Sequence, residues 1–326
     1  MSRIRGALQS PWVRGGFVVV ALAAAAIAVW LSWPDVYSAL TRLDPLLLVA
    51  ACLVSPAYLV ATMLVWRVLL SDLGSHLTPR DAFAVFFVSQ LGKYLPGSFW
   101  NVVAAAELGA DRDVPRRRSL TGMAVALLLS LVTGLGLGVV GLLMSPQEAR
   151  GRFDAVLWLL PFLVVLALPP VVNRLVGWFL RVLRRPPLEH ALTLRGTLGA
   201  LGWSVAGWLL AGLQIWLLGV AAGMEASATS YLICAGGYAL AWSLGFLFVP
   251  VPAGVGVREV VLVAVLSGVL DHGGVLVVVL ISRAILTVVD IGLAGTAAAL
   301  SRSRAGRQAL DDGPPPPESQ RPGDSR

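Results

Sequence analysis

The sequence predicts an all-α, polytopic membrane protein, a helical bundle of about eight spans with one or two re-entrant or broken helices. The chain of 326 residues is 57% hydrophobic and only 13% charged, which is too apolar for a soluble globular domain. Several apolar runs reach the roughly 20 residues that a membrane-crossing helix needs. These runs are continuous, whereas the strands of an outer-membrane barrel would alternate apolar and polar residues.

The apolar runs give the positions of the spans. The first run follows Arg3, Arg5 and Arg14, as in a signal peptide. No small-residue cleavage site comes after it, so we interpret it as an uncleaved span. The crossings are expected at 17–33, 46–70, 119–144, 155–173, 197–221, 229–249, 252–270 and 273–299.

The arginines indicate how the chain is oriented. Basic segments at 112–118, at 174–195 and after residue 300 are expected in the cytoplasm by the positive-inside rule, together with both termini. The net charge of +7 therefore indicates contact with anionic lipid headgroups and not binding of nucleic acid. We expect one transmembrane domain at 1–300 and a disordered cytoplasmic tail at 301–326, which is rich in arginine and then in proline.

The stretch 82–106 is apolar, yet both of its flanks are basic and predicted to be cytoplasmic. We therefore expect a re-entrant hairpin there and not a crossing. Pro96 and Gly97 interrupt the helix near its middle, with Gly92 just before them. A new half-helix that starts near Phe99 would point its free amides and positive dipole end into the membrane, which favours an anion.

Lys93, the only lysine of the chain, precedes this break. One interpretation is a phosphate site, since a compact ammonium binds phosphate as a point charge. The other is a lysine that reaches the headgroups from a helix end. Irregular backbone at membrane depth must be buried in protein or line a wet cavity. The substrate-binding side chains expected around such a cavity are Gln90, Lys93, Tyr94, Trp100 and Asn101.

A second break lies at Pro252, Gly254 and Gly256. We expect a helix to restart after Gly256 with Arg258 and Glu259 in its first turn, as two further binding residues. The pattern leaves open whether 250–270 crosses the membrane or is re-entrant. Discontinuous segments in both halves of a chain are typical of a transporter site. The alternative is that both breaks are loop ends where basic side chains meet headgroups.

The last span carries Arg283, Thr287 and Asp290 on one helix face. We expect a structural charge pair between Arg283 and Asp290, or between Arg283 and Glu259, with a role in transport as the alternative. Ser204 and Gln214 are expected to form hydrogen bonds between helices.

The sequence contains no motif typical of metal binding, nucleotide binding or catalysis. The three histidines are isolated, and there is no metal-binding cluster, nucleotide-binding fingerprint or nucleophile elbow. We therefore expect no metal, no cofactor and no catalytic residue. An intramembrane enzyme that uses Glu107, Glu259 or Asp290 is a minor alternative, because no two carboxylates stand at catalytic spacing.

The two breaks together resemble the lysylphosphatidylglycerol synthase transmembrane-region family, also called UPF0104. The segment from Gly92 to Gly97 is similar to the family's G-K-Y-x-P-G, and Trp100-Asn101 follows it. The segment 252–259 is similar to P-G-G-x-G-x-R-E, with Ala253 where a glycine is usual. The resemblance implies a flippase-like protein of the bacterial inner membrane. It does not imply synthase activity here, because the soluble transferase domain that follows in the best-understood members is replaced by a short tail.

We therefore expect a lipid translocator that moves an anionic or aminoacylated phospholipid, or a polyprenyl-phosphate-linked lipid, between leaflets. The alternative is an accessory subunit without transport activity, bound to a glycosyltransferase or a lipid-modifying enzyme of the membrane. The sequence does not give the direction of transport, the energy source or the oligomeric state.

Overall fold

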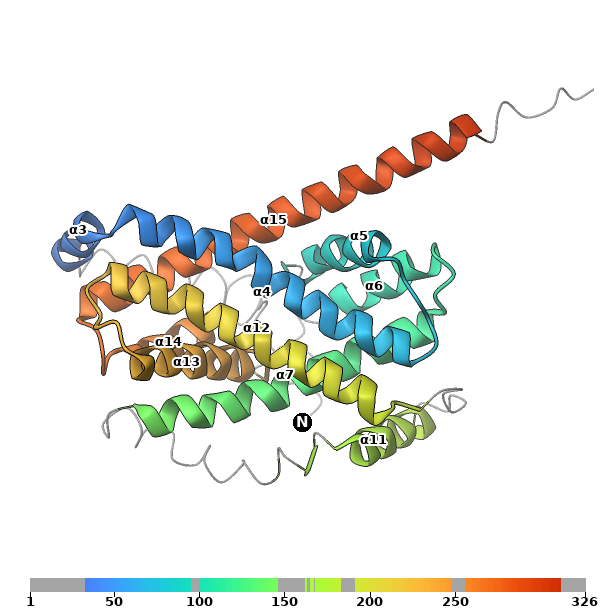
Figure 1. Cartoon of the computed structure of the whole chain (residues 1–326), viewed down its shortest axis with the longest axis horizontal. Helices are drawn as coiled ribbons and strands as arrows, with labels where there is room; N and C mark the ends of the chain where they lie inside the picture. Colours follow the sequence, from blue (N-terminus) through green and yellow to red (C-terminus); the bar gives the residue numbers. More distant parts are fainter. Residues whose placement is uncertain are drawn as a thin grey trace, which may run out of the picture.

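The computed structural model describes residues 33–94, 100–145, 162, 165–166, 168–182, 191–247 and 256–311. Every regular element within these ranges is helical, which confirms the all-α prediction (Figure 1). The helices are α3 Trp33–Arg42, α4 Pro45–Asp72, α5 Pro79–Gln90, the 3-10 helix η1 Leu91–Tyr94, α6 Trp100–Ala110, α7 Arg116–Met144, α11 Pro169–Val182, α12 Leu194–Ala221, α13 Ala228–Leu247, α14 Val257–Leu266 and α15 His272–Asp311.

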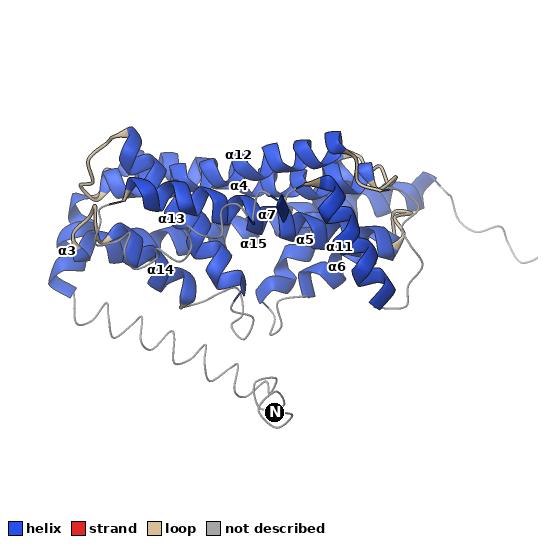
Figure 2. Ribbon diagram, turned by 90° about the horizontal axis from the view of Figure 1, so that it is seen from below, coloured by secondary structure: helices blue, strands red, loops and turns tan. Residues whose placement is uncertain are grey.

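Five of the described helices are long and apolar enough to cross a membrane, namely α4, α7, α12, α13 and α15. The chain is thus a multi-pass membrane protein, and these helices coincide with five of the predicted spans. α4, α7, α12 and α15 run along the bundle (Figures 1 and 2). The predicted span 17–33, except Trp33, and most of the span 155–173 lie outside the described residues. The spans predicted in these two regions stay predictions.

Local sequence explains where several helices begin. The Asp44 carboxylate accepts the N–H of Leu46 at 2.8 Å and caps α4. The Thr78 hydroxyl accepts the N–H of Asp81 at 3.2 Å at the start of α5. α12 begins beside the end of α4, because the Thr193 N–H and hydroxyl both donate to the Asp72 carboxylate at 2.7 Å. This contact fixes the first residues of α12 and the last residues of α4 at the same end of the bundle.

The first hairpin consists of α5, η1 and α6. Its outer ends meet where Arg112, just after α6, forms an ion pair with Asp81 of α5, with 3.3 Å between Nε and Oδ1. Its two helices have 12 and 11 residues, which at 1.5 Å per residue reach about halfway through a 30 Å hydrocarbon core. The chain therefore enters and leaves at the same end of the bundle, as predicted for 82–106.

The second hairpin consists of α13 and α14, and it corrects the predicted crossing at 252–270. α14 has only ten residues, too few to span a bilayer. It runs antiparallel to α13, since Gly245 faces Arg258 while Gly237 faces Val265. The loops at its outer ends, 221–223 and 267–271, line one surface depression. The alternative left open by the sequence, a re-entrant element, is the one observed. This hairpin opens toward the end of the bundle opposite to the first.

The core of the bundle is closed by small residues and interhelical hydrogen bonds. A Cβ on Gly141 of α7 would lie 2.7 Å from the Cα of Gly236 in α13, so the two backbones touch. Ser282 donates to the side-chain oxygen of Gln214 at 3.1 Å, and the hydroxyls of Thr133 and Ser204 lie 2.7 Å apart. These contacts confirm the interhelical role predicted for the side chains at 204 and 214.

The last helix differs from the prediction at its far end. α15 continues to Asp311, eleven residues beyond the boundary expected at residue 300 (Figure 1). The residues after 300 include arginine, alanine, glutamine and leucine, which favour helix, and the proline run starts only at Pro314. The remainder of the predicted tail lies outside the described residues. α15 ends at the end of the bundle where the first hairpin opens, since Arg112 donates to the Ser301 hydroxyl at 3.4 Å.

Candidate functional site

The inner ends of the two hairpins face one cavity of about 190 Å³. The hairpins enter from opposite ends of the bundle (Figure 2), so the cavity at their inner ends lies between these two ends. α4, α7, α12 and α15 supply the surrounding walls. The charged side chains that line the cavity are Lys93, Arg258, Glu259, Arg283 and Asp290.

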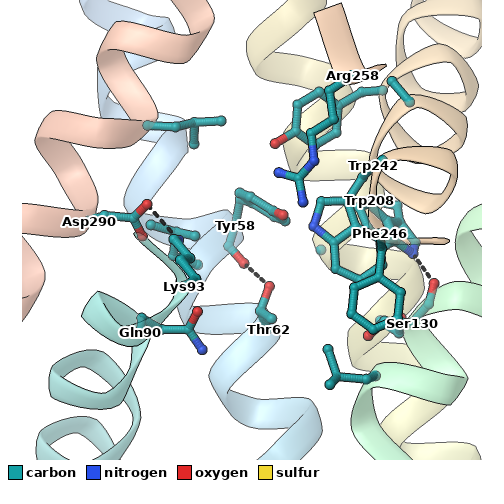
Figure 3. Close-up of a pocket in the computed structure, with 18 of the residues that line it drawn as sticks. Tyr58, Thr62, Gln90, Lys93, Ser130, Trp208, Trp242, Phe246, Arg258 and Asp290 are labelled. Carbon is teal, nitrogen blue, oxygen red and sulfur yellow. Dashed lines mark hydrogen bonds and ion pairs between the residues drawn. The ribbon is translucent and has the colours of Figure 1, made fainter. Parts of the chain in front are cut away.

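The first hairpin presents Gln90, Lys93 and Asn101 to the cavity. The Lys93 ammonium lies 2.6 Å from a carboxylate oxygen of Asp290, which comes from α15 (Figure 3). The two side chains differ in burial, since that of Lys93 is 27% exposed and that of Asp290 only 5%. Asn101 lies in the first turn of α6, and its side-chain oxygen is buried without a hydrogen-bond partner among the described residues.

The second hairpin presents Arg258 and Glu259 from the first turn of α14. Gly256 precedes this turn with φ of +86°, a conformation that costs a residue with a Cβ. The Glu259 carboxylate accepts the Gly256 N–H at 2.6 Å, so it caps the start of α14. The same carboxylate lies 3.5 Å from Arg283 of α15.

Arg258 differs from the other two cations of the cavity. Its guanidinium lies over the ring of Trp242, with 5.6 Å from Cζ to the centroid. None of the described carboxylates lies within ion-pair distance of it, and its Nε is buried without a hydrogen-bond partner in the described structure. Figure 3 shows Arg258 reaching into the cavity from one side, with Lys93 and Asp290 on the other.

The structure selects between the two charge pairs expected for Arg283, and it places Trp100 away from the cavity. The charge pair expected between Arg283 and Asp290 does not form, because Glu259 and Lys93 from the two hairpins approach these side chains more closely than they approach each other. The alternative pairing of Arg283 with Glu259 is the observed one. Trp100 does not line the cavity, and its side chain is 41% exposed. Successive residues on a helix point about 100° apart, so its neighbour Asn101 faces inward and Trp100 does not.

Of the remaining residues predicted for the site or the helix breaks, the structure describes some and not others. Gly92 is a close-approach site, since a Cβ there would lie 2.6 Å from the backbone nitrogen of Asn101. The breaks at Pro96, Gly97, Pro252 and Gly254 lie outside the described residues, as does the side chain of Tyr94.

The sequence analysis missed the aromatic wall of the cavity, which comes from α4, α12 and α13. Trp208 and Trp242 meet edge to face with centroids 5.1 Å apart, and Trp242 stacks on Phe246 at 5.3 Å. Tyr58 and Tyr238 complete the wall. Each of these residues lies inside an apolar run, where an aromatic side chain is ordinary. The available signal was the recurrence of Trp and Tyr within spans that also carry glycine and serine.

The cavity is built to attract an anion. In the part of the chain that the structure describes, three cationic and two anionic side chains line it, and two helices begin beside it with their positive dipole ends. Within the described residues no group of three or more His, Cys, Asp or Glu side chains is placed to hold a metal ion.

Comparison with known proteins agrees with the resemblance found in the sequence. A family model described as the lysylphosphatidylglycerol synthase TM region matches residues 17–294. A comparison with curated proteins gives no significant match. The family match covers both hairpins, every wall of the cavity and well over half of the chain, and so the chain belongs to the lysylphosphatidylglycerol synthase transmembrane-region family.

Proposed function

We propose that this protein is a lipid translocator, which moves a phosphate-bearing lipid between the two leaflets without chemical change. Its family and its apolar helices make it a lipid-related membrane protein. The observation that carries the proposal is that two hairpins, open to opposite ends of the bundle, end at one cavity that is lined by cationic side chains. Broken helices that meet near the midplane are the arrangement in which many transporters bind their substrates.

The size of the cavity fits a headgroup and not a whole lipid. Its volume of about 190 Å³ is below the roughly 300–1,000 Å³ of ordinary small-molecule pockets. The lipid tails would therefore remain in the bilayer while the headgroup passes through the bundle. Each hairpin lies between the cavity and one end of the bundle, so displacing one hairpin at a time would open the cavity to one leaflet.

The polar side chains of the cavity have distinct parts in this proposal. Arg258 would hold the phosphate, while the ion pair of Lys93 with Asp290 would fix the opposite wall of the cavity. Gln90 and Asn101 would donate hydrogen bonds to the rest of the headgroup. Candidate substrates are anionic phospholipids, aminoacylated phospholipids and polyprenyl-phosphate-linked lipids. The arginine distribution and the family resemblance favour the bacterial inner membrane, with both termini in the cytoplasm.

Reconstitution into vesicles tests the proposal. Purified protein should speed the exchange of a fluorescent phosphatidylglycerol between leaflets, measured as its loss of protection from an impermeant quencher. Lys93→Ala and Arg258→Ala should return the rate to that of protein-free vesicles. Arg174→Ala is the matched control, because Arg174 of α11 is exposed and does not line the cavity.

The control variant should exchange lipid at the wild-type rate. Wild-type protein that leaves the exchange rate unchanged for anionic, aminoacylated and polyprenyl-phosphate lipids alike would reject the proposal.

The accessory-subunit alternative has less support. A docking surface for an enzyme would need free basic side chains, yet three arginines of the segment 112–118 are bonded within the chain. Arg112 pairs with Asp81, Arg116 with Glu107 at 2.8 Å, and Arg118 donates to the carbonyl of Gly74 at 3.0 Å. Copurification of a stoichiometric enzyme, together with failure of the isolated chain to move lipid, would reverse this preference.

A further inference from the structure

We propose that the cavity selects lipids whose headgroup carries a single net negative charge, a phosphodiester with an uncharged hydroxylated substituent. The inference rests on the proposed translocation and names the substrate class of that same site. Phosphatidylglycerol and polyprenyl phosphodiesters of sugars share this chemistry, whereas phosphomonoesters and zwitterionic phospholipids do not.

The cavity carries a net positive charge. Among the described residues, three cationic side chains and two carboxylates line it, which leaves 3 − 2 = +1. Lys93 and Asp290 neutralise each other, as do Arg283 and Glu259, so the remaining charge resides on Arg258. The two segments that join the hairpin helices, 95–99 and 248–255, contain no ionisable residue in their sequence. They therefore do not change the count.

A headgroup whose charge does not match that of the cavity binds at a cost in free energy. Charges in a site shielded from water interact more strongly than in solution, and an uncompensated charge there is unfavourable. A phosphodiester monoanion brings the cavity to neutrality. A phosphomonoester dianion would leave one negative charge, and a zwitterionic headgroup would leave Arg258 uncompensated.

The geometry around the Arg258 guanidinium suits a phosphate group. One face of its guanidinium is covered by Trp242, and the N–H groups at the edge of this planar fork suit two phosphate oxygens. Its Nε, buried and without a partner among the described residues, is a donor that a phosphate oxygen would satisfy.

The neutral part of the headgroup would meet uncharged polar groups. Gln90 and Asn101 line the cavity on the side of the first hairpin, and the buried side-chain oxygen of Asn101 lacks a donor within the described structure. A hydroxyl group supplies that donor, and it accepts from the amide nitrogens in return. An ammonium would instead compete with Lys93 for Asp290.

Binding measurements on the purified protein test this selectivity without requiring transport. The probes are short-chain phosphatidylglycerol, phosphatidic acid and phosphatidylcholine, added at pH 8 in neutral detergent, with the shift in thermal midpoint giving affinity. We expect phosphatidylglycerol to bind about tenfold or more tightly than the other two. A polyprenyl phosphodiester of a sugar shows whether the preference extends to isoprenoid lipids, and inorganic phosphate shows whether the acyl chains are needed.

Charge variants make the test specific. Asp290→Asn and Glu259→Gln each raise the cavity to +2, and each should move the preference from phosphatidylglycerol to phosphatidic acid. Arg258→Gln lowers it to zero and should abolish the preference for anions. Arg174→Gln removes a cation outside the cavity and should leave the order of affinities unchanged. Two different substitutions give the cavity a net charge of +2. If one of these variants misfolds, the other still tests the inference.

The result that overturns the inference is an order of affinities that ignores headgroup charge, or one that stays the same in both +2 variants. If the preference holds but no vesicle experiment shows exchange, translocation fails and the binding site stands. If exchange occurs with equal rates for all three charge classes, selectivity fails and translocation stands.

Discussion

The two hairpins have the same arrangement of helices, but their cationic side chains have different partners. In each, one helix runs from an end of the bundle to the cavity and a second helix returns toward the same end (Figure 2). Each carries one cation next to the break, Lys93 before it in the first hairpin and Arg258 after it in the second. Lys93 is 2.6 Å from Asp290, whereas Arg258 has an aromatic ring beside it and no carboxylate among the described residues.

The charge of Lys93 stabilises the structure through its ion pair, whereas the charge of Arg258 is available to a ligand. The ion pair on one side of the cavity ties the first hairpin to α15 and contributes no net charge. Arg258 is held by its contact with Trp242, and it leaves the cavity positive. From the sequence alone the two cations look equivalent, and only their partners distinguish them.

The largest expected effect comes from breaking the ion pair of the first hairpin. Lys93→Met should lower the free energy of unfolding by about 3–5 kcal/mol, because it leaves the buried Asp290 carboxylate uncompensated. Arg258→Met should cost much less, because none of the described carboxylates loses a partner. Unfolding in mixed micelles with increasing SDS measures both.

The double variant Lys93→Met/Asp290→Leu serves as the control for this pair. Replacing both charges by apolar groups should restore most of the lost stability. Equal losses for the two single variants would mean that the hairpins do not differ in the way proposed.

A smaller loss of stability is expected when the closely packed glycine of each hairpin is replaced by alanine. Gly92→Ala should cost about 1–3 kcal/mol, since the new Cβ would meet the backbone of Asn101 and Trp100. Gly245→Ala should cost less, because its Cβ would meet the flexible side chain of Arg258, 2.6 Å away at Cγ. Thermal midpoints in detergent check the order. A larger loss at Gly245 would show that the second hairpin is the more tightly packed one.

The smallest effect concerns the turn into α14. Gly256→Ala should cost about 1–2 kcal/mol, because the φ of +86° is unfavourable for a residue with a Cβ. Gly202→Ala is the matched control in α12, where a Cβ meets nothing within 4 Å, and helix propensity predicts a gain of up to about 1 kcal/mol. A loss of the same size at both positions would contradict the role given to Gly256.

The sequence was sufficient to predict the fold class and the positions of five spans, because continuous apolar runs report membrane helices directly. It also predicted the first hairpin, since two basic flanks on one side exclude a crossing. The second hairpin stayed open, because its flanks carry too few charges for the positive-inside rule to decide. Its antiparallel packing depends on the contacts of Gly237 and Gly245, which no local pattern reveals.

The site was predicted in part. Proline and glycine breaks next to Lys93 and Arg258 pointed to the residues that meet in the cavity. The pairing of Asp290 with Lys93 joins residues almost 200 positions apart, and periodicity within one helix suggested Arg283 instead. Trp100 and Asn101 are adjacent in sequence, so only the rotation of α6 decides which of them faces inward. The residues of the aromatic wall could not be recognised in the sequence, because Trp and Tyr within an apolar run are equally typical of ordinary packing.

The most direct test of the account compares lipid exchange by two charge-deletion variants in the same vesicles. Arg258→Gln removes the cation that pairs with none of the described carboxylates, while Lys93→Gln/Asp290→Asn removes a neutral pair and leaves the net charge of the cavity at +1. We predict that Arg258→Gln exchanges phosphatidylglycerol at the rate of protein-free vesicles and that the double variant remains clearly faster. If Arg258→Gln matched the wild type while the double variant lost exchange, the ligand charge would belong to the first hairpin and the account would be wrong.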